Sequence, residues 1–133
     1  MSDPVMIFHL AIPCAELDSA EDFYVGVLGC QLARKYADRI TLNFFGHQLV
    51  CHLSPDDVSD SLKLYPRHFG MTFRDREGFD QVIKRVEEHE DGFLRPVSTR
   101  FKGMTEEHLT FFLADPSNNI LEFKYYLDPG KMY

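Results

Sequence analysis

Apolar and polar residues alternate in eight short stretches of the chain, a period of two that predicts β-strands. Two longer stretches repeat their apolar residues every three or four positions, which predicts helices. Asp18 and Ser19 indicate a cap at the start of the first helix, and Gly29 and Gly92 mark the ends of the two helices. Strands are expected at residues 6–13, 33–39, 40–45, 47–54, 67–73, 93–101, 108–114 and 118–126, and helices at 17–29 and 76–92.

The predicted elements occur twice in the same order, as a strand, a helix and three strands. This internal repeat predicts two βαβββ modules in an α+β fold, with mixed sheets and the helices outside. We place module one at about residues 5–54, a polar linker at about 55–65, and module two at about 66–127. The chain has 133 residues, of which 44% are hydrophobic, so a single domain with a substantial core is expected.

One face of the predicted strands carries polar residues that do not suit a core. His9 and His68 occupy corresponding positions in the two modules, and each is followed on its face by small residues. Glu122, in the last strand, is predicted to lie on this face too. A strand with such a face is expected to line a cavity. The residues expected on the opposite, helix-facing side are Phe8, Leu10, Ile12, Leu49, Cys51, Leu53, Phe69, Met71, Phe73, Leu121, Phe123 and Tyr125.

Two imidazoles and one carboxylate form a ligand set that suits a divalent metal ion, with coordination positions left open for other molecules. The set His9, His68 and Glu122 is therefore a candidate metal site. The alternative is that both histidines are hydrogen-bonded core residues, and that Glu122 forms an ordinary ion pair with Lys124 or Arg67. Because the repeat places all three residues on one face, we favour the metal site.

The net charge of −7 argues against a nucleic-acid or anionic-membrane partner, because no basic stripe is present to neutralise phosphates. The sequence has no apolar run of membrane-spanning length and no signal-peptide pattern at its start, so a cytoplasmic protein is expected. Cys14, Cys30 and Cys51 are expected to be buried thiols and not a disulfide framework.

The sequence resembles the vicinal oxygen chelate superfamily of glyoxalases, bleomycin-resistance proteins and extradiol dioxygenases. It is most similar to the small predicted extradiol-type dioxygenases. The stretches that carry the resemblance are FHLAIPC, LDSAEDFYVGVLGC, LNFFGHQLVCHLSP, RHFGMTF and TFFLADPSNNILEFK. The resemblance implies that the sheets of two modules curl into an open barrel around a metal. It also implies His9, His68 and Glu122 as the metal ligands, a small-molecule substrate, and a homodimer.

One position departs from the four-ligand glyoxalase pattern. Val50 stands where glyoxalase I would present a carboxylate, and valine cannot coordinate a metal. A three-ligand set of two histidines and one carboxylate is instead the arrangement of non-haem Fe(II) oxygenases. We therefore expect a dioxygenase that cleaves the ring of a small catechol-like substrate, with Fe(II) as the favoured metal and Mn(II), Ni(II) or Zn(II) as alternatives.

Several further residues are candidates for roles beside the metal. His52 and His108 are expected to transfer protons, because an imidazole both accepts and donates a proton near neutral pH. His52 is alternatively a fourth ligand or a solvent-facing residue. Asn43, Arg100 and Phe112 are candidate pocket residues. The same ligands would also suit a non-oxidative isomerase, lyase or transferase, and the fold would suit a protein that binds a small antibiotic-like ligand.

Overall fold

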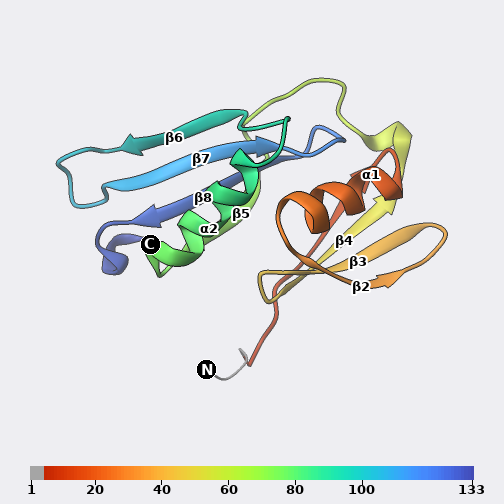
Figure 1. Cartoon of the computed structure of the whole chain (residues 1–133), viewed down its shortest axis with the longest axis horizontal. Coiled ribbons are helices and arrows are strands. Elements are labelled where there is room, and N and C mark those ends of the chain that lie inside the picture. Colours follow the sequence, from red (N-terminus) through yellow and green to blue (C-terminus); the bar gives the residue numbers. More distant parts are fainter. Residues whose placement is uncertain (1–4) are drawn as a thin grey trace. The chain divides into compact units, whose positions relative to one another are not determined.

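Each of two four-stranded sheets is accompanied by one helix in the computed structural model, which describes residues 5–133 (Figure 1). The chain divides into two compact units. The first holds the residues up to Ser61 together with Asp115–Asn119, and the second holds Leu62–Ala114 and Ile120–Tyr133. The predicted order of strand, helix and three strands is confirmed in both halves of the chain.

The first unit contains a mixed sheet with the strand order β1-β4-β3-β2. Strand β1 runs parallel to β4, whereas β3 is antiparallel to both β4 and β2. The helix α1 continues directly into a π-helical segment, η1, and a short 3-10 turn follows β4. The elements are β1 (His9–Cys14), α1 (Leu17–Glu21), η1 (Asp22–Val27), β2 (Gln31–Lys35), β3 (Arg39–Phe44), β4 (His47–Leu53) and η2 (Pro55–Asp57).

The period of two in β1 and β4 is confirmed by which side chains are buried. Ile12 and Leu49 are buried among the core residues, and so are all three cysteines, which are free thiols as predicted. Two residues predicted for the core side differ: Phe8 and Leu53 are 65% and 43% exposed. Phe8 lies just before β1 and Leu53 is the last residue of β4, so both stand at the ends of their strands.

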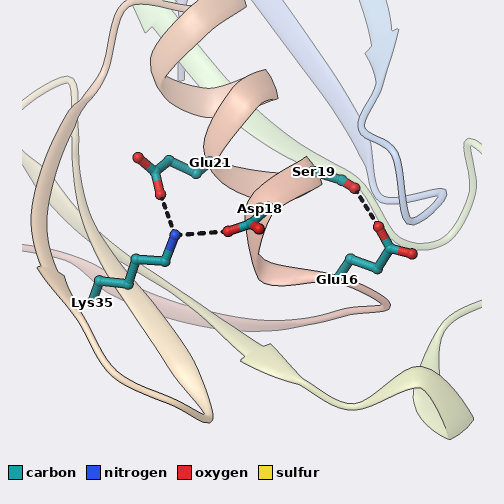
Figure 2. A network of polar contacts seen from close by, with 5 residues as sticks. All are labelled: Glu16, Asp18, Ser19, Glu21 and Lys35. Carbon is teal, nitrogen blue, oxygen red and sulfur yellow. Dashed lines mark hydrogen bonds and ion pairs between the residues drawn. The ribbon is translucent and has the colours of Figure 1, made fainter.

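The start of the first helix differs from the prediction. Glu16 and not Asp18 or Ser19 precedes the helix, and its side chain does not cap a backbone N–H. The side chains instead make other contacts, which Figure 2 shows: the Ser19 hydroxyl donates to Glu16 at 2.9 Å, and Lys35 of β2 donates to Asp18 and Glu21 at 2.8 Å each. These two bonds raise the pKa of Lys35, and the bond from Lys35 lowers the pKa of Asp18. The network ties β2 to α1 at the surface.

The turn Asp115–Asn119 belongs to the first unit and is held there by a buried carboxylate. The hydroxyl of Tyr24, which is fully buried, donates to Asp115 Oδ2 at 2.7 Å. Asp115 Oδ1 accepts from the backbone N–H groups of Ser117 and Asn119 at 2.8 and 2.9 Å. The Ser117 hydroxyl in turn accepts from the Ala15 N–H at 2.9 Å. Burial and the charge of Asp115 both raise the pKa of Tyr24, so the phenol stays protonated.

The second unit repeats the mixed sheet, in the order β5-β8-β7-β6 with β5 parallel to β8. Asp75 caps α2, because its side chain accepts from the Gly78 N–H at 3.1 Å. The helix ends at Glu87 and not at Gly92, which lies in a later turn with φ of 60°. The elements are β5 (Phe69–Phe73), α2 (Arg76–Glu87), β6 (Arg95–Arg100), β7 (His108–Ala114), β8 (Ile120–Tyr126) and a 3-10 turn η3 (Pro129–Lys131).

The core of the second unit is an aromatic cluster between α2 and one face of the sheet. Figure 1 shows this helix beside the strands β5 and β8. Phe111 of β7 and Phe123 of β8 stack with ring centroids 5.3 Å apart, and Phe79 of α2 lies 5.3 Å from Phe111. All three are fully buried. The burial of Phe123 confirms its predicted place on the helix-facing side of the sheet. The opposite face of this sheet therefore carries the remaining residues of β5 and β8, including Glu122.

None of the helices in residues 5–133 has the length and apolarity needed to cross a membrane.

Candidate functional site

Two of the three predicted metal ligands lie together in the second unit. His68 Nε2 is 3.0 Å from Glu122 Oε1. His68 immediately precedes β5, and Glu122 lies in the adjacent parallel strand β8, opposite Gly70. The parallel pairing therefore brings together two side chains that are far apart in the sequence. Neither Lys124 nor Arg67 forms an ion pair with Glu122 among the described residues, so the partner is His68.

The Glu122 carboxylate is buried, with 9% of the residue exposed, and both of its oxygens have partners. Thr110 of β7 donates its hydroxyl to Oε2 at 2.5 Å, which leaves Oε1 for His68. Phe112, opposite Glu122 on β7, covers the pair with its ring centroid 5.8 Å from that of His68. The Tyr65 ring packs edge-on at 5.5 Å from His68. Burial among these groups removes water from the carboxylate, so its remaining contacts matter more.

Gly70 permits the close approach of β5 to β8 at this point. A Cβ atom on residue 70 would lie 1.7 Å from the backbone oxygen of Glu122. No side chain can occupy that space unless the backbone shifts. Gly70 therefore sets the spacing of the two strands that carry His68 and Glu122.

The contact of His68 Nδ1 with a backbone carbonyl shows which ring nitrogen carries a hydrogen. Nδ1 is 2.6 Å from the Leu64 carbonyl oxygen, which can only accept, so Nδ1 is the N–H donor. In a neutral imidazole, Nε2 then presents a lone pair, and this lone pair faces the Glu122 carboxylate. Two acceptors at 3.0 Å require either a hydrogen on one of the two atoms or a metal ion bound by both.

The donor set at this pair fits a divalent metal. An imidazole nitrogen and a carboxylate oxygen are ligand types that divalent metals such as Fe(II), Mn(II) and Zn(II) bind, and His68 Nε2 and Glu122 Oε1 would be the two ligand atoms. The Leu64 carbonyl and the Thr110 hydroxyl orient the two side chains, as hydrogen-bond partners of metal ligands do in metalloproteins. Within residues 5–133, no group of three or more His, Cys, Asp or Glu side chains is gathered closely enough to hold a metal.

Comparison with known families identifies the fold. The sequence profile of the Glyoxalase/Bleomycin resistance protein/Dioxygenase superfamily matches residues 6–123 of the chain. The chain belongs to this superfamily. No curated protein matches the chain. The family resemblance drawn from the sequence motifs is thus confirmed.

Solved structures of the superfamily resemble the chain over its whole length. A glyoxalase/bleomycin resistance protein/dioxygenase from Alicyclobacillus acidocaldarius has 58% identity and a TM-score of 0.93, and the match covers 100% of both chains. A lactoylglutathione lyase from Agrobacterium tumefaciens has 22% identity and a TM-score of 0.67, covering 92% of this chain and 94% of that one. The fosfomycin resistance protein FosX from Listeria monocytogenes has 14% identity and a TM-score of 0.66, covering 99% and 100%. The last two share the fold alone.

The third predicted ligand of this superfamily member, His9, lies in the first unit. It is the exposed first residue of β1 and is opposite Gln48 of β4. Val50 is half-buried on β4, where it pairs with Ala11 and Thr41. His9 stays a predicted ligand, on the strength of the repeat that places it in the position corresponding to His68.

The two predicted proton-transfer residues lie in different surroundings. His108 is buried on the Glu122 face of its sheet, with Nδ1 bonded to the Glu106 carbonyl at 2.9 Å and its ring 4.4 Å from that of Tyr126. His52 is exposed on β4 of the first unit, opposite Arg39 and Pro13. Their catalytic roles remain predictions.

The predicted pocket residues also differ in their contacts. Phe112 touches His68, as described above. Arg100 is exposed at the end of β6, opposite His108. Asn43, in the first unit, accepts the Gly46 N–H at 2.8 Å and so closes the turn between β3 and β4. Sequence reasoning missed Thr110 and the Leu64 carbonyl. The strand period places Thr110 on the Glu122 face, whereas no residue pattern identifies a backbone carbonyl in an irregular segment.

Proposed function

We propose that the protein is a metal-dependent enzyme in which His68, Glu122 and His9 hold a divalent metal, with Fe(II) favoured. The observation that supports this best is the distance of 3.0 Å between His68 Nε2 and the buried Glu122 carboxylate, while His68 Nδ1 is bonded to the Leu64 carbonyl. Membership of the superfamily adds support, because it contains metal-dependent enzymes. The reaction proposed is cleavage of the ring of a small catechol-like substrate by dioxygen.

The chain's own residues would prepare and enclose this site. The Leu64 carbonyl keeps the hydrogen on His68 Nδ1, so that Nε2 remains a ligand. Thr110 fixes the carboxylate of Glu122 by its hydroxyl. Phe112 excludes water from one side of the pair. His108, whose Nδ1 is bonded to the Glu106 carbonyl, is the proposed acceptor of a proton from a substrate hydroxyl, through its Nε2.

When bound, a divalent metal would lower the pKa of a chelating hydroxyl, and Fe(II) would in addition bring dioxygen to the activated substrate. Two vicinal oxygens on a flat ring suit such chelation. The aromatic side chains Phe112 and Tyr65 beside His68 offer apolar contacts for a ring of this kind.

Anaerobic reconstitution with Fe(II) followed by oxygen-uptake measurements against a panel of catechols tests the proposal. Wild-type protein is expected to bind iron and to consume oxygen with at least one diol. His68→Ala should lose the metal, whereas His89→Ala, which changes a histidine after α2, should retain it. Equal metal content in the wild type and His68→Ala would overturn the site. Stoichiometric iron without oxygen uptake would overturn the dioxygenase reaction and favour a non-oxidative isomerase, lyase or transferase.

A protein that only binds a small ligand is the other alternative, and metal content separates it from both enzymes. Such a protein would bind its ligand equally well in the wild type and in His68→Ala. We propose the metal-dependent enzyme first because His68 and Glu122 supply an imidazole nitrogen and a carboxylate oxygen side by side, two ligand types of divalent metals.

We also propose a homodimer. Four consecutive apolar residues, Val5 to Phe8, lie before β1, and each of them is at least 59% exposed. A patch of this kind on a free monomer would be costly in water, and burial against a second copy removes that cost. Light scattering at several concentrations should give twice the chain mass, and a monomer at all concentrations would exclude the dimer.

A further inference from the structure

Charge is distributed unevenly between the second sheet and the rest of the chain. The whole chain has 21 acidic and 14 basic residues, a net charge of −7. In β5, β6, β7 and β8, however, Glu122 is the one acidic residue, while Arg95, Arg100 and Lys124 are basic. The sheet that carries Glu122, and that His68 immediately precedes, is therefore positive within an acidic protein.

The basic side chains lie on the same face of this sheet as Glu122. Lys124 follows Glu122 by two residues in β8, so both side chains leave the strand on one side. Its partner across β7 is Thr110, the residue that bonds to Glu122. Arg100 is opposite His108 on the same face, at the end of β6.

These cations have no anionic partner within the described part of the chain. No carboxylate lies within ion-pair distance of Lys124 or Arg100 in residues 5–133. Lys124 is half-buried, with Nζ 5.9 Å from the centre of the Tyr126 ring. The Arg100 guanidinium lies 5.6 Å from the centre of the Phe101 ring. Glu122, the nearest acid in the strand, is already bonded to Thr110 and His68.

We infer that the molecule bound at the His68–Glu122 pair carries a carboxylate or similar anionic group in addition to its chelating oxygens, an inference that rests on the proposed function. Two residues along a strand span about 7 Å, so one small molecule can reach from Glu122 to Lys124. Lys124 is the principal counter-charge, because it is half-buried and adjacent on the strand. Arg100 reinforces it from β6. The positive side chains also attract anions as they approach this face.

The test compares two probes of equal size that differ in charge, 3,4-dihydroxybenzoate and 3,4-dihydroxybenzamide. Binding is measured by calorimetry on Zn(II)-loaded protein, where no turnover occurs, and on metal-free protein. The variants are Lys124→Gln, Arg100→Gln and the charge-preserving Lys124→Arg. Lys84→Gln on α2 serves as the control, because it makes the same change of charge on the helix. Circular dichroism confirms that each variant is folded.

Wild-type protein is expected to bind the benzoate about three to ten times more tightly than the amide, the range for a partly exposed charge pair. This preference should weaken in high salt, disappear in Lys124→Gln, and persist in Lys124→Arg and Lys84→Gln. Equal affinity for the two probes, with and without metal, would overturn the inference. A preference unchanged in both Lys124→Gln and Arg100→Gln would overturn it as well. Failure to bind Zn(II) would count against the proposed function alone, because the probes also compare charge on the metal-free protein.

Discussion

Thr110→Val is a direct test of how the Glu122 carboxylate is held. The substitution keeps the branched shape of the side chain and removes only the hydroxyl that donates to Oε2 at 2.5 Å. Thr110 is 2% exposed and Glu122 is 9% exposed, so water cannot readily replace the lost donor. A hydrogen bond to a buried charged group contributes about 1.5–3 kcal/mol, and we expect the free energy of unfolding to fall by that amount.

Loss of the hydrogen bond from Thr110 to Glu122 should also weaken metal binding. A hydrogen-bond partner that orients a metal ligand typically changes metal affinity by about 10–100-fold. We therefore expect Thr110→Val to weaken binding of Zn(II) or Co(II) by this factor, as measured by competition with a chromophoric chelator. Urea unfolding of the metal-free protein gives the stability term separately.

Two matched variants make this result specific. Thr110→Ser retains the hydroxyl and should restore most of both the stability and the affinity. Thr72→Val makes the same substitution in β5, where Thr72 is opposite Lys124. In residues 5–133 the Thr72 hydroxyl is not a hydrogen-bond partner of Glu122. It should change the stability by about 0.5 kcal/mol or less. If Thr110→Val matched the wild type in both measurements, the hydrogen bond would have no role in positioning Glu122.

Three further outcomes follow from other parts of the structure. Gly70→Ala should destabilise the protein by about 3 kcal/mol or more in urea unfolding, because the added Cβ would lie 1.7 Å from the Glu122 carbonyl oxygen. Gly26→Ala is the control and should not cause this loss, because an added Cβ at residue 26 has nothing within 4 Å. Tyr24→Phe should cost about 1–3 kcal/mol, because it leaves Asp115 without the phenol donor, and an unchanged melting curve would contradict this role. Burial raises the pKa values of Cys14 and Cys51 in the folded chain, so the unfolded chain loses these protons first and stability should fall as pH rises above about 8.5. Cys51→Ala should reduce this slope by about 1.4 kcal/mol per pH unit in urea unfolding from pH 7.5 to 10.5, and an equal slope in both proteins would refute the assignment.

Much of the second unit could be predicted from its sequence because its strands alternate cleanly. Phe111 and Phe123 follow the strand period and are buried, and the same period places Glu122 on the other face. The correspondence of His68 with His9 in the repeat predicts His68 as a site residue, and His68 contacts Glu122 in the structure. These features depend on the spacing of residues within one strand, which the sequence shows directly.

Other features depend on contacts that no local pattern contains. Asp18 and Ser19 are residue types that often cap helices, but Asp18 lies inside the first turn of α1. Its side chain accepts a hydrogen bond from Lys35, a residue of β2. The hydrogen bond between Leu64 and His68 involves a backbone carbonyl, so it is independent of the residue type at position 64. Gly70 was expected only as a small residue in a cavity wall, whereas its role is the close approach of two backbones.

The burial of all three cysteines has a practical consequence for labelling. A thiol-reactive dye requires an accessible thiolate, and Cys14, Cys30 and Cys51 are all enclosed in the first unit. Cysteines introduced at exposed positions such as Glu16 and Lys84, one on each unit, would therefore react selectively. A donor–acceptor pair attached there would report the separation of the two halves directly in solution, without first removing any native residue.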